Sequence, residues 1–222
     1  MAMRRMALAT SIAAVCLAVA GAASGHRLVA IGETFPSQTE ALRIEALDVS
    51  QVAYVELTAE EPELWIGFDV NGPTDLFLSL GLPRLDRLVD DRPQIRVVRA
   101  TSDGTTEVAA YDTGSVDAPR LFHEPFTGTD SWILLEETVV LREPGTYFLV
   151  AAEAEAEAGK LWVSVGRREA FSVADVLSFP SVVRRVRAFH EVGRRGPAPI
   201  EWATLLGFAV LAAVVVVAAT RD

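Results

Sequence analysis

The stretch ELWIGFDVNGPTDLFLSLGL, residues 63–82, decides the fold class of this 222-residue chain. Apolar side chains recur at every second position on both sides of its centre, which is the period of a half-buried β-strand. The centre reads Asn71-Gly72-Pro73-Thr74, and a Gly-Pro pair interrupts regular structure. We therefore predict two strands, Glu63–Val70 and Asp75–Leu82, joined by a turn.

The same pattern extends outward in both directions. Turn residues separate the segments, as in SDGT at Ser102 and EPGT at Glu143. Many short strands with no helix between them are typical of an antiparallel β-sandwich, so residues 25–171 are predicted to form a mainly β, jelly-roll-like sandwich domain. The further predicted strands are Val52–Thr58, Gln94–Ala100, Thr106–Asp112, Ser131–Leu141, Thr146–Ala154 and Lys160–Gly166.

The N-terminal residues 1–24 have the three parts of a secretory signal peptide. Arg4 and Arg5 precede an apolar run, which ends in small residues suited to cleavage. An uncleaved N-terminal anchor is the alternative. The only cysteine, Cys16, lies inside the apolar run. A cleaved chain therefore has no thiol, and its domain is held together by packing alone.

The C-terminal residues 200–220 are predicted to form one transmembrane helix. The stretch from Trp202 to Thr220 carries no charge, and its Leu, Val and Phe residues favour insertion by roughly 3–5 kcal/mol. Residues 194–199 form a linker, and residues 221–222 form a cytoplasmic tail. Together with the signal, this gives a single-pass type I protein of the cell membrane, with the bulk of the chain extracytoplasmic.

Residues 172–193 are expected to form juxtamembrane amphipathic helices. Ser172 and Asp175 resemble a capping box, and Pro180 suits the first turn of a second helix. Two interpretations stay open: the helix lies on the membrane surface, or it packs on the sandwich. Arginines on the exported flank oppose the positive-inside rule, which weakens once a long domain is committed to export. The candidate membrane-surface residues are Arg184, Arg185, Arg187, Arg194 and Arg195.

The strand and turn sequence of residues 52–166 resembles the pre-peptidase C-terminal (PPC) type of β-sandwich found in exported proteins. The resemblance rests on Phe68-Asp69, Asp75-Leu76 and Gly145-Thr146-Tyr147. The layout of signal, sandwich, helix and span is also similar to GOLD-domain membrane cargo receptors. This chain lacks their cysteine pair, long coiled coil and sorting tail. Neither resemblance implies a catalytic residue.

A candidate site lies in RLFHEPFTGTDSW, residues 120–132, read as a loop between strands. Its His123, Glu124 and Asp130 offer nitrogen and oxygen ligands for a metal, although their spacing matches no established motif. A calcium-binding turn at Asp86, Asp90 and Asp91 is the weaker alternative, against local pairing with neighbouring arginines. No catalytic, cofactor-binding or confirmed metal residue is identified.

The formal net charge of −10 argues against nucleic acid as a partner, because phosphate binding needs a basic surface. The sequence therefore predicts a non-enzymatic binding or accessory module for other envelope proteins, with the lipid bilayer and a protein as partners. The alternative is an assembly or cargo-type subunit that acts through its amphipathic helix and span. An envelope hydrolase is the weakest of the three hypotheses, since no nucleophile and base can be paired.

Overall fold

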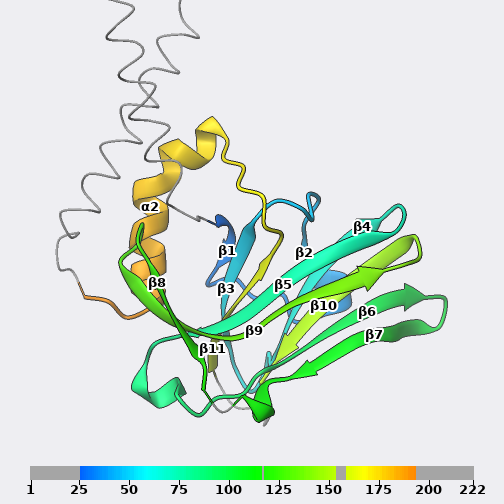
Figure 1. Ribbon diagram of the computed structural model, residues 1–222, viewed down its shortest axis with the longest axis horizontal. Helices are drawn as coiled ribbons and strands as arrows, with labels where there is room; N and C mark the ends of the chain where they lie inside the picture. The colour runs from blue at the N-terminus through cyan, green and yellow to red at the C-terminus, as the bar shows by residue number, and fades with distance from the viewer. Residues whose placement is uncertain (1–25, 117, 154–158, 194–222) are drawn as a thin grey trace, which may run out of the picture.

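The computed structural model describes residues 26–116, 118–153 and 159–193, which form two β-sheets and one α-helix (Figure 1). The six-stranded sheet has the order β1 (Arg27–Ile31), β3 (Gln51–Leu57), β11 (Gly159–Val165), β5 (Thr74–Pro83), β9 (Thr129–Leu141), β8 (Arg120–Glu124). The five-stranded sheet has the order β2 (Leu42–Arg43), β4 (Glu63–Val70), β10 (Gly145–Ala152), β6 (Gln94–Thr101), β7 (Gly104–Asp112). The helix is α2 (Val173–Phe189), and three short 3-10 turns are η1 (Gln38–Glu40), η2 (Asp86–Leu88) and η3 (Thr113–Ser115).

All eight predicted strands are present, and the mainly β fold is confirmed. The sheets are mixed, however, where a purely antiparallel sandwich was predicted: β1 runs parallel to β3, and β2 runs parallel to β4. Both parallel strands come from the first part of the domain, are only five and two residues long, and lie at sheet edges. Strands this short contain too few alternations to give a period-two signal.

The turn at residues 71–73 carries the chain from one sheet to the other, because β4 and β5 belong to opposite layers. The apolar side chains of both strands therefore meet in the core between the sheets. Leu76, Leu78, Leu80 and Leu82 alternate along β5 and are fully buried there. Full burial of one such side chain contributes about 1.5–3 kcal/mol, so packing of this kind can hold the domain together without a disulfide.

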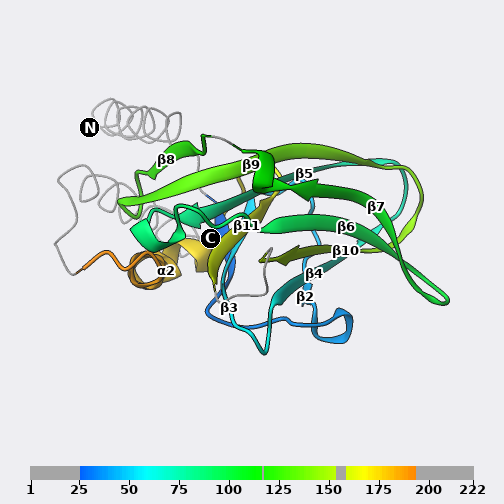
Figure 2. The same cartoon turned by 90° about the horizontal axis from the view of Figure 1, so that it is seen from below.

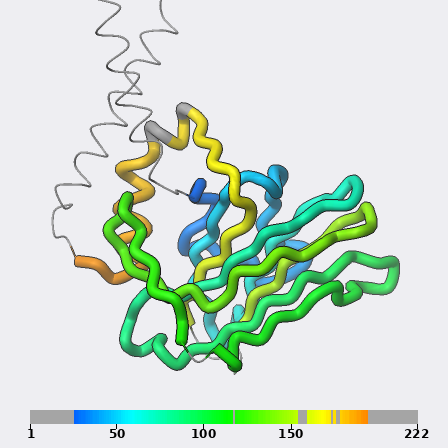
Figure 3. Tube along the Cα trace, viewed as in Figure 1, coloured from blue at the N-terminus to red at the C-terminus, as the bar shows by residue number. Residues whose placement is uncertain are grey.

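The helix α2 packs against the outer face of the six-stranded sheet, as Figures 2 and 3 show beside β1 and β3. Its Val186 and Phe189 are buried with Ile31 of β1, next to Tyr54 of β3. Of the two interpretations of this segment, packing on the sandwich is the one observed. The part of the outer sheet face under α2 is therefore apolar as well, which contributes to the burial of β3.

One helix spans the segment where two were expected, and Pro180 lies inside it. The predicted capping box is present: Ser172 accepts from the Asp175 amide, and the Asp175 carboxylate accepts from the Ser172 amide. Within residues 26–193 as described, no helix is long and apolar enough to cross a membrane. The predicted signal, linker, span and tail lie outside the described residues.

Candidate binding groove

Residues 120–132 form a β-hairpin rather than the predicted loop, which separates the three candidate metal ligands. His123 and Asp130 are cross-strand partners on β8 and β9, and His123 Nδ1 lies 2.8 Å from Asp130 Oδ1. Side chains of adjacent strand residues point to opposite faces, so Glu124 faces the other side of the sheet. Among the described residues, no group of three His, Cys, Asp or Glu side chains is arranged to hold a metal ion.

The candidate calcium ligands Asp86, Asp90 and Asp91 around η2 are not arranged to hold a metal ion either. Arg92 contacts local groups, since it donates to the Val89 and Asp91 carbonyls, but the other two arginines of this segment contact more distant groups than expected. Arg87 forms an ion pair with Glu191, which follows α2, and Arg84 lies 3.4 Å from Asp130 on β9. The η2 turn is thereby fastened to the ends of α2 and of the β8–β9 hairpin. No local pattern indicates these partners, which are 104 and 46 positions away in the sequence.

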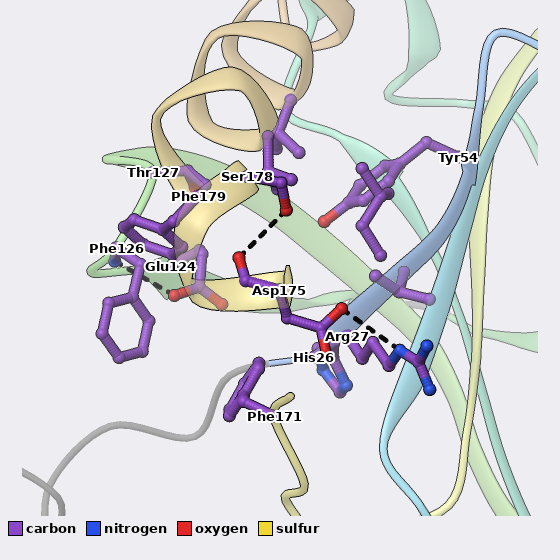
Figure 4. Close-up of a pocket in the computed structure, with 14 residues that line it drawn as sticks. His26, Arg27, Tyr54, Glu124, Phe126, Thr127, Phe171, Asp175, Ser178 and Phe179 are labelled. Atoms are coloured by element: carbon purple, nitrogen blue, oxygen red, sulfur yellow. Dashed lines mark hydrogen bonds and ion pairs between the residues drawn. The ribbon is translucent and has the colours of Figure 1, made fainter. Parts of the chain in front are cut away.

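A groove lies between α2 and the outer face of the six-stranded sheet (Figure 4). The space inside it that a water-sized molecule can occupy is about 80 Å³. Four segments that are distant in sequence supply its walls: the start of β1, the first half of β3, the β8–β9 turn, and α2 with the residues before it. The lining side chains include Leu28, Val52, Tyr54, Glu124, Phe126, Phe171, Phe179, Val182 and Val186.

The walls are mainly apolar and aromatic. The Phe126 and Phe179 rings meet edge to face, with centroids 5.9 Å apart, so the hairpin turn and the helix touch at this point. Phe171, which precedes α2, is exposed at the mouth of the groove. Aromatic side chains that remain partly exposed beside a cavity are typical of binding surfaces. Phe126 stands in a polar stretch, residues 123–130, which is a signal that could have indicated it, whereas Phe179 follows the apolar pair Val176-Leu177.

One carboxyl group of the groove has an unusual pKa. Burial raises the pKa of Glu124 to about 7, although the Phe126 amide donates a hydrogen bond to Glu124 Oε1 at 3.1 Å. Burial also lowers the pKa of His26, so its imidazole stays neutral at pH 7. At the rim, Arg27 Nε lies 3.4 Å from Asp175 Oδ1. The groove therefore combines an apolar interior with one carboxyl group that ionises near neutral pH.

A serine–histidine pair holds the C-terminal end of α2 on β9. His190 Nδ1 lies 2.9 Å from the Val186 carbonyl, which can only accept, so this nitrogen carries the proton. Nε2 is then the acceptor, and Ser131 Oγ donates to it across 3.1 Å. Both residues are buried, and neither lines the groove. The pair lacks a carboxylate on Nδ1 and contact with the groove, so it serves docking of the helix.

The candidate membrane-surface arginines occupy different environments. Arg184 is exposed on α2. Arg185 donates to the Ile31 carbonyl at 2.6 Å and also contacts Glu33, while Arg187 donates to the Thr127 carbonyl at 2.7 Å. Arg194 and Arg195 lie outside the described residues. Contact of these five residues with a bilayer stays a prediction.

The two sheets define the described chain as a β-sandwich domain, and PPC domains are among the solved structures that resemble it. The PPC domain of a collagenase from Bacillus anthracis is 13% identical over 56% of this chain and 93% of that chain, with a TM-score of 0.35. CBM27-1 of Caldicellulosiruptor saccharolyticus, solved with mannohexaose, is 15% identical over 66% and 88%, with a TM-score of 0.38. CorA, a surface-associated copper-binding protein of Methylomicrobium album, is 11% identical over 63% and 100%, with a TM-score of 0.30.

No protein-family model matches the sequence, and no curated protein sequence is significantly similar to it. Structural similarities at this level carry no argument about ligands. The function is therefore argued from the groove and its residues.

Proposed function

We propose that this chain is a non-enzymatic binding module, anchored in the cell membrane, whose groove between α2 and the six-stranded sheet receives a segment of another envelope protein. The groove is the observation that carries the proposal. Its apolar walls suit apolar side chains. The predicted signal and span support an extracytoplasmic position for it.

The chemistry of the groove narrows the kind of segment. Glu124 is half-buried in a groove that Phe126, Phe171 and Phe179 also line, and a carboxylate in such a place is stabilised by an opposite charge within about 4–6 Å. We therefore infer a partner segment that presents apolar side chains next to one Lys or Arg. Because the cation needs the ionised carboxylate, binding should strengthen as the pH rises through about 7.

Site-specific photo-crosslinking tests the groove. A photoreactive residue in place of Ser178, which is exposed at the groove, should yield one discrete protein adduct in intact membranes. The same residue in place of Val108 on β7 is the control, since Val108 is 42% exposed on the other sheet. Equal adducts from both positions, or none from Ser178, would contradict the proposal.

Substitution of Glu124 by Gln tests the charge. The amide keeps an acceptor for the Phe126 amide but cannot ionise, so we expect at least a tenfold weaker adduct at Ser178 and an unchanged melting temperature. Glu137→Gln, at an exposed position on β9, is the matched control and should leave the adduct intact. An adduct that survives Glu124→Gln would show that the partner presents no cation there.

Protease accessibility tests the membrane topology. In spheroplasts, added protease should digest the sandwich and leave a small membrane fragment that carries a C-terminal tag. Arg221 and Asp222 alone would remain on the cytoplasmic side. A body that is protected until the membrane is broken would contradict the exported topology and favour the side indicated by the arginines.

A further inference from the structure

A second cavity lies on the same outer sheet face, beside the groove under α2. Residues of β11, β5, β9 and β8 line it, and the space in it that a water-sized molecule can occupy is about 340 Å³. It meets the first groove at His26, whose Nδ1 lies 2.5 Å from Ser50 Oγ. The cavity is independent of the groove to which the proposed function is assigned, because its other lining residues differ.

Three residues that line this cavity each carry a buried polar atom that has no hydrogen-bond partner among the described residues: Ser79 Oγ, Ser164 Oγ and Trp162 Nε1. Ser79 and Ser164 are register partners on β5 and β11, so their side chains are neighbours on one face of the sheet. Trp162 precedes Ser164 by two positions and shares its face. The three residues are 3%, 1% and 5% exposed. Buried polar groups in proteins are normally hydrogen-bonded, so this cluster indicates a missing partner.

The walls of the cavity combine aromatic faces with paired charges. Phe77 and Phe122 line it, and the Arg167 guanidinium lies 4.0 Å from the Phe77 ring centroid. Arg120 donates to Glu136 at 2.6 Å. Two arginines and the carboxylates of Glu136 and Glu169 leave the lining with no net charge, His26 being neutral. A strongly charged ligand is therefore disfavoured.

We propose that this cavity binds a sugar residue. A pyranose ring presents hydroxyl groups on its edge and C–H groups on its faces. The edge matches the two serine hydroxyls and the indole N–H, and the faces match the aromatic walls. A neutral polyhydroxy ligand also matches the balanced charge of the lining. The assignment rests on these groups alone and goes beyond the partner-binding role proposed for the groove under α2.

Calorimetric titration of the full chain tests the assignment. The chain is reconstituted in nanodiscs without glycoside detergents and titrated separately with glucose, mannose, galactose, N-acetylglucosamine and glycerol. At least one sugar should bind more tightly than glycerol. Absence of binding by every sugar, or glycerol binding that equals the best sugar, would overturn the proposal.

The double variant Ser79→Ala/Ser164→Ala tests the cavity itself. We expect it to bind the best sugar at least tenfold more weakly and to melt at the same or a higher temperature, because it removes buried hydroxyls that lack partners. Ser102→Ala, in the exposed β6–β7 turn, is the control and should bind like the natural chain. Unchanged binding, or a lower melting temperature of the double variant, would overturn the proposal. A failed crosslink at Ser178 leaves this result unaffected, so the two proposals fail separately.

Discussion

Replacing Gly166 with Ala should destabilise the domain by about 3 kcal/mol or more, because two costs add at this position. Gly166 has φ +72°, and the left-handed region costs a residue with a Cβ roughly 1–2 kcal/mol. A Cβ there would also come within 2.2 Å of the Val49 carbonyl oxygen. That oxygen belongs to the backbone, so it cannot rotate away, and the contact forces the two chain segments apart.

The segments that would separate are central to the sheet. Gly166 donates to the Phe77 carbonyl, and the amides of Arg167 and Arg168 both donate to the Asp48 carbonyl. The first bond fastens the end of β11 to β5, and the other two fasten it to the segment that precedes β3. A shift at Gly166 therefore disturbs several backbone hydrogen bonds, each of which leaves an unsatisfied group when broken.

Gly32→Ala is the matched control. Gly32 has nearly the same φ, +77°, but nothing lies within 4 Å of the Cβ that alanine would add. It should lose only the conformational cost, roughly 1–2 kcal/mol. Urea unfolding of the full chain, followed by circular dichroism, gives both values. Equal losses in the two variants would show that the Val49 contact relaxes freely.

The sequence predicted the strands because their signal is local. The alternation of leucines along residues 76–82 can be read without any knowledge of the fold, and the structure buries those leucines in the core. The same alternation cannot show that β4 and β5 belong to opposite sheets, since a turn of a given sequence can join strands within or between layers. The parallel pairing of β1 with β3 depends equally on distant contacts.

The candidate site could be predicted only in part. Glu124 was singled out from the sequence, and it does line the groove, but it does so without His123 and Asp130. The alternation along β8 turns Glu124 away from them, and reading residues 120–132 as a loop concealed that alternation. The aromatic walls come from segments on β8–β9 and α2 that meet only when the helix docks. Their proximity is a tertiary property with no counterpart in sequence spacing.

Acid should weaken the docking of that helix through His190. Burial lowers the pKa of His190 from 6.5 to about 4 in the folded chain, while the unfolded chain keeps the ordinary value. Between these values the unfolded state binds the proton and the folded state does not, so the contribution to stability is complete above pH 6.5 and declines as the pH falls towards 4. At about 1.4 kcal/mol per pH unit, we expect a loss of about 3 kcal/mol.

The comparison that isolates this effect is with His190→Gln, which cannot titrate. Glu124 and Glu153, whose pKa values burial raises to about 7, act in the opposite direction and stabilise the fold as the pH falls. Their contributions are common to both proteins and cancel in the difference. The unfolding free energy should therefore fall by about 3 kcal/mol more in the natural chain than in His190→Gln when the pH is lowered from 7 to 4. Parallel curves would show that His190 titrates alike in both states.

The site of the loss can be located as well. A protonated His190 would carry a hydrogen on Nε2, the atom that now accepts from Ser131. The Ser131 hydroxyl would then have to turn so that it accepts this hydrogen bond instead of donating it. Because this bond joins α2 to β9, hydrogen exchange should accelerate first in the amides of α2 as the pH falls from 6.5 towards 4. The core strands β5 and β10 should exchange last, since their side chains contact neither His190 nor the groove under α2. The closed groove then depends on a neutral His190, and release of α2 at low pH would open the outer sheet face while leaving the sandwich folded.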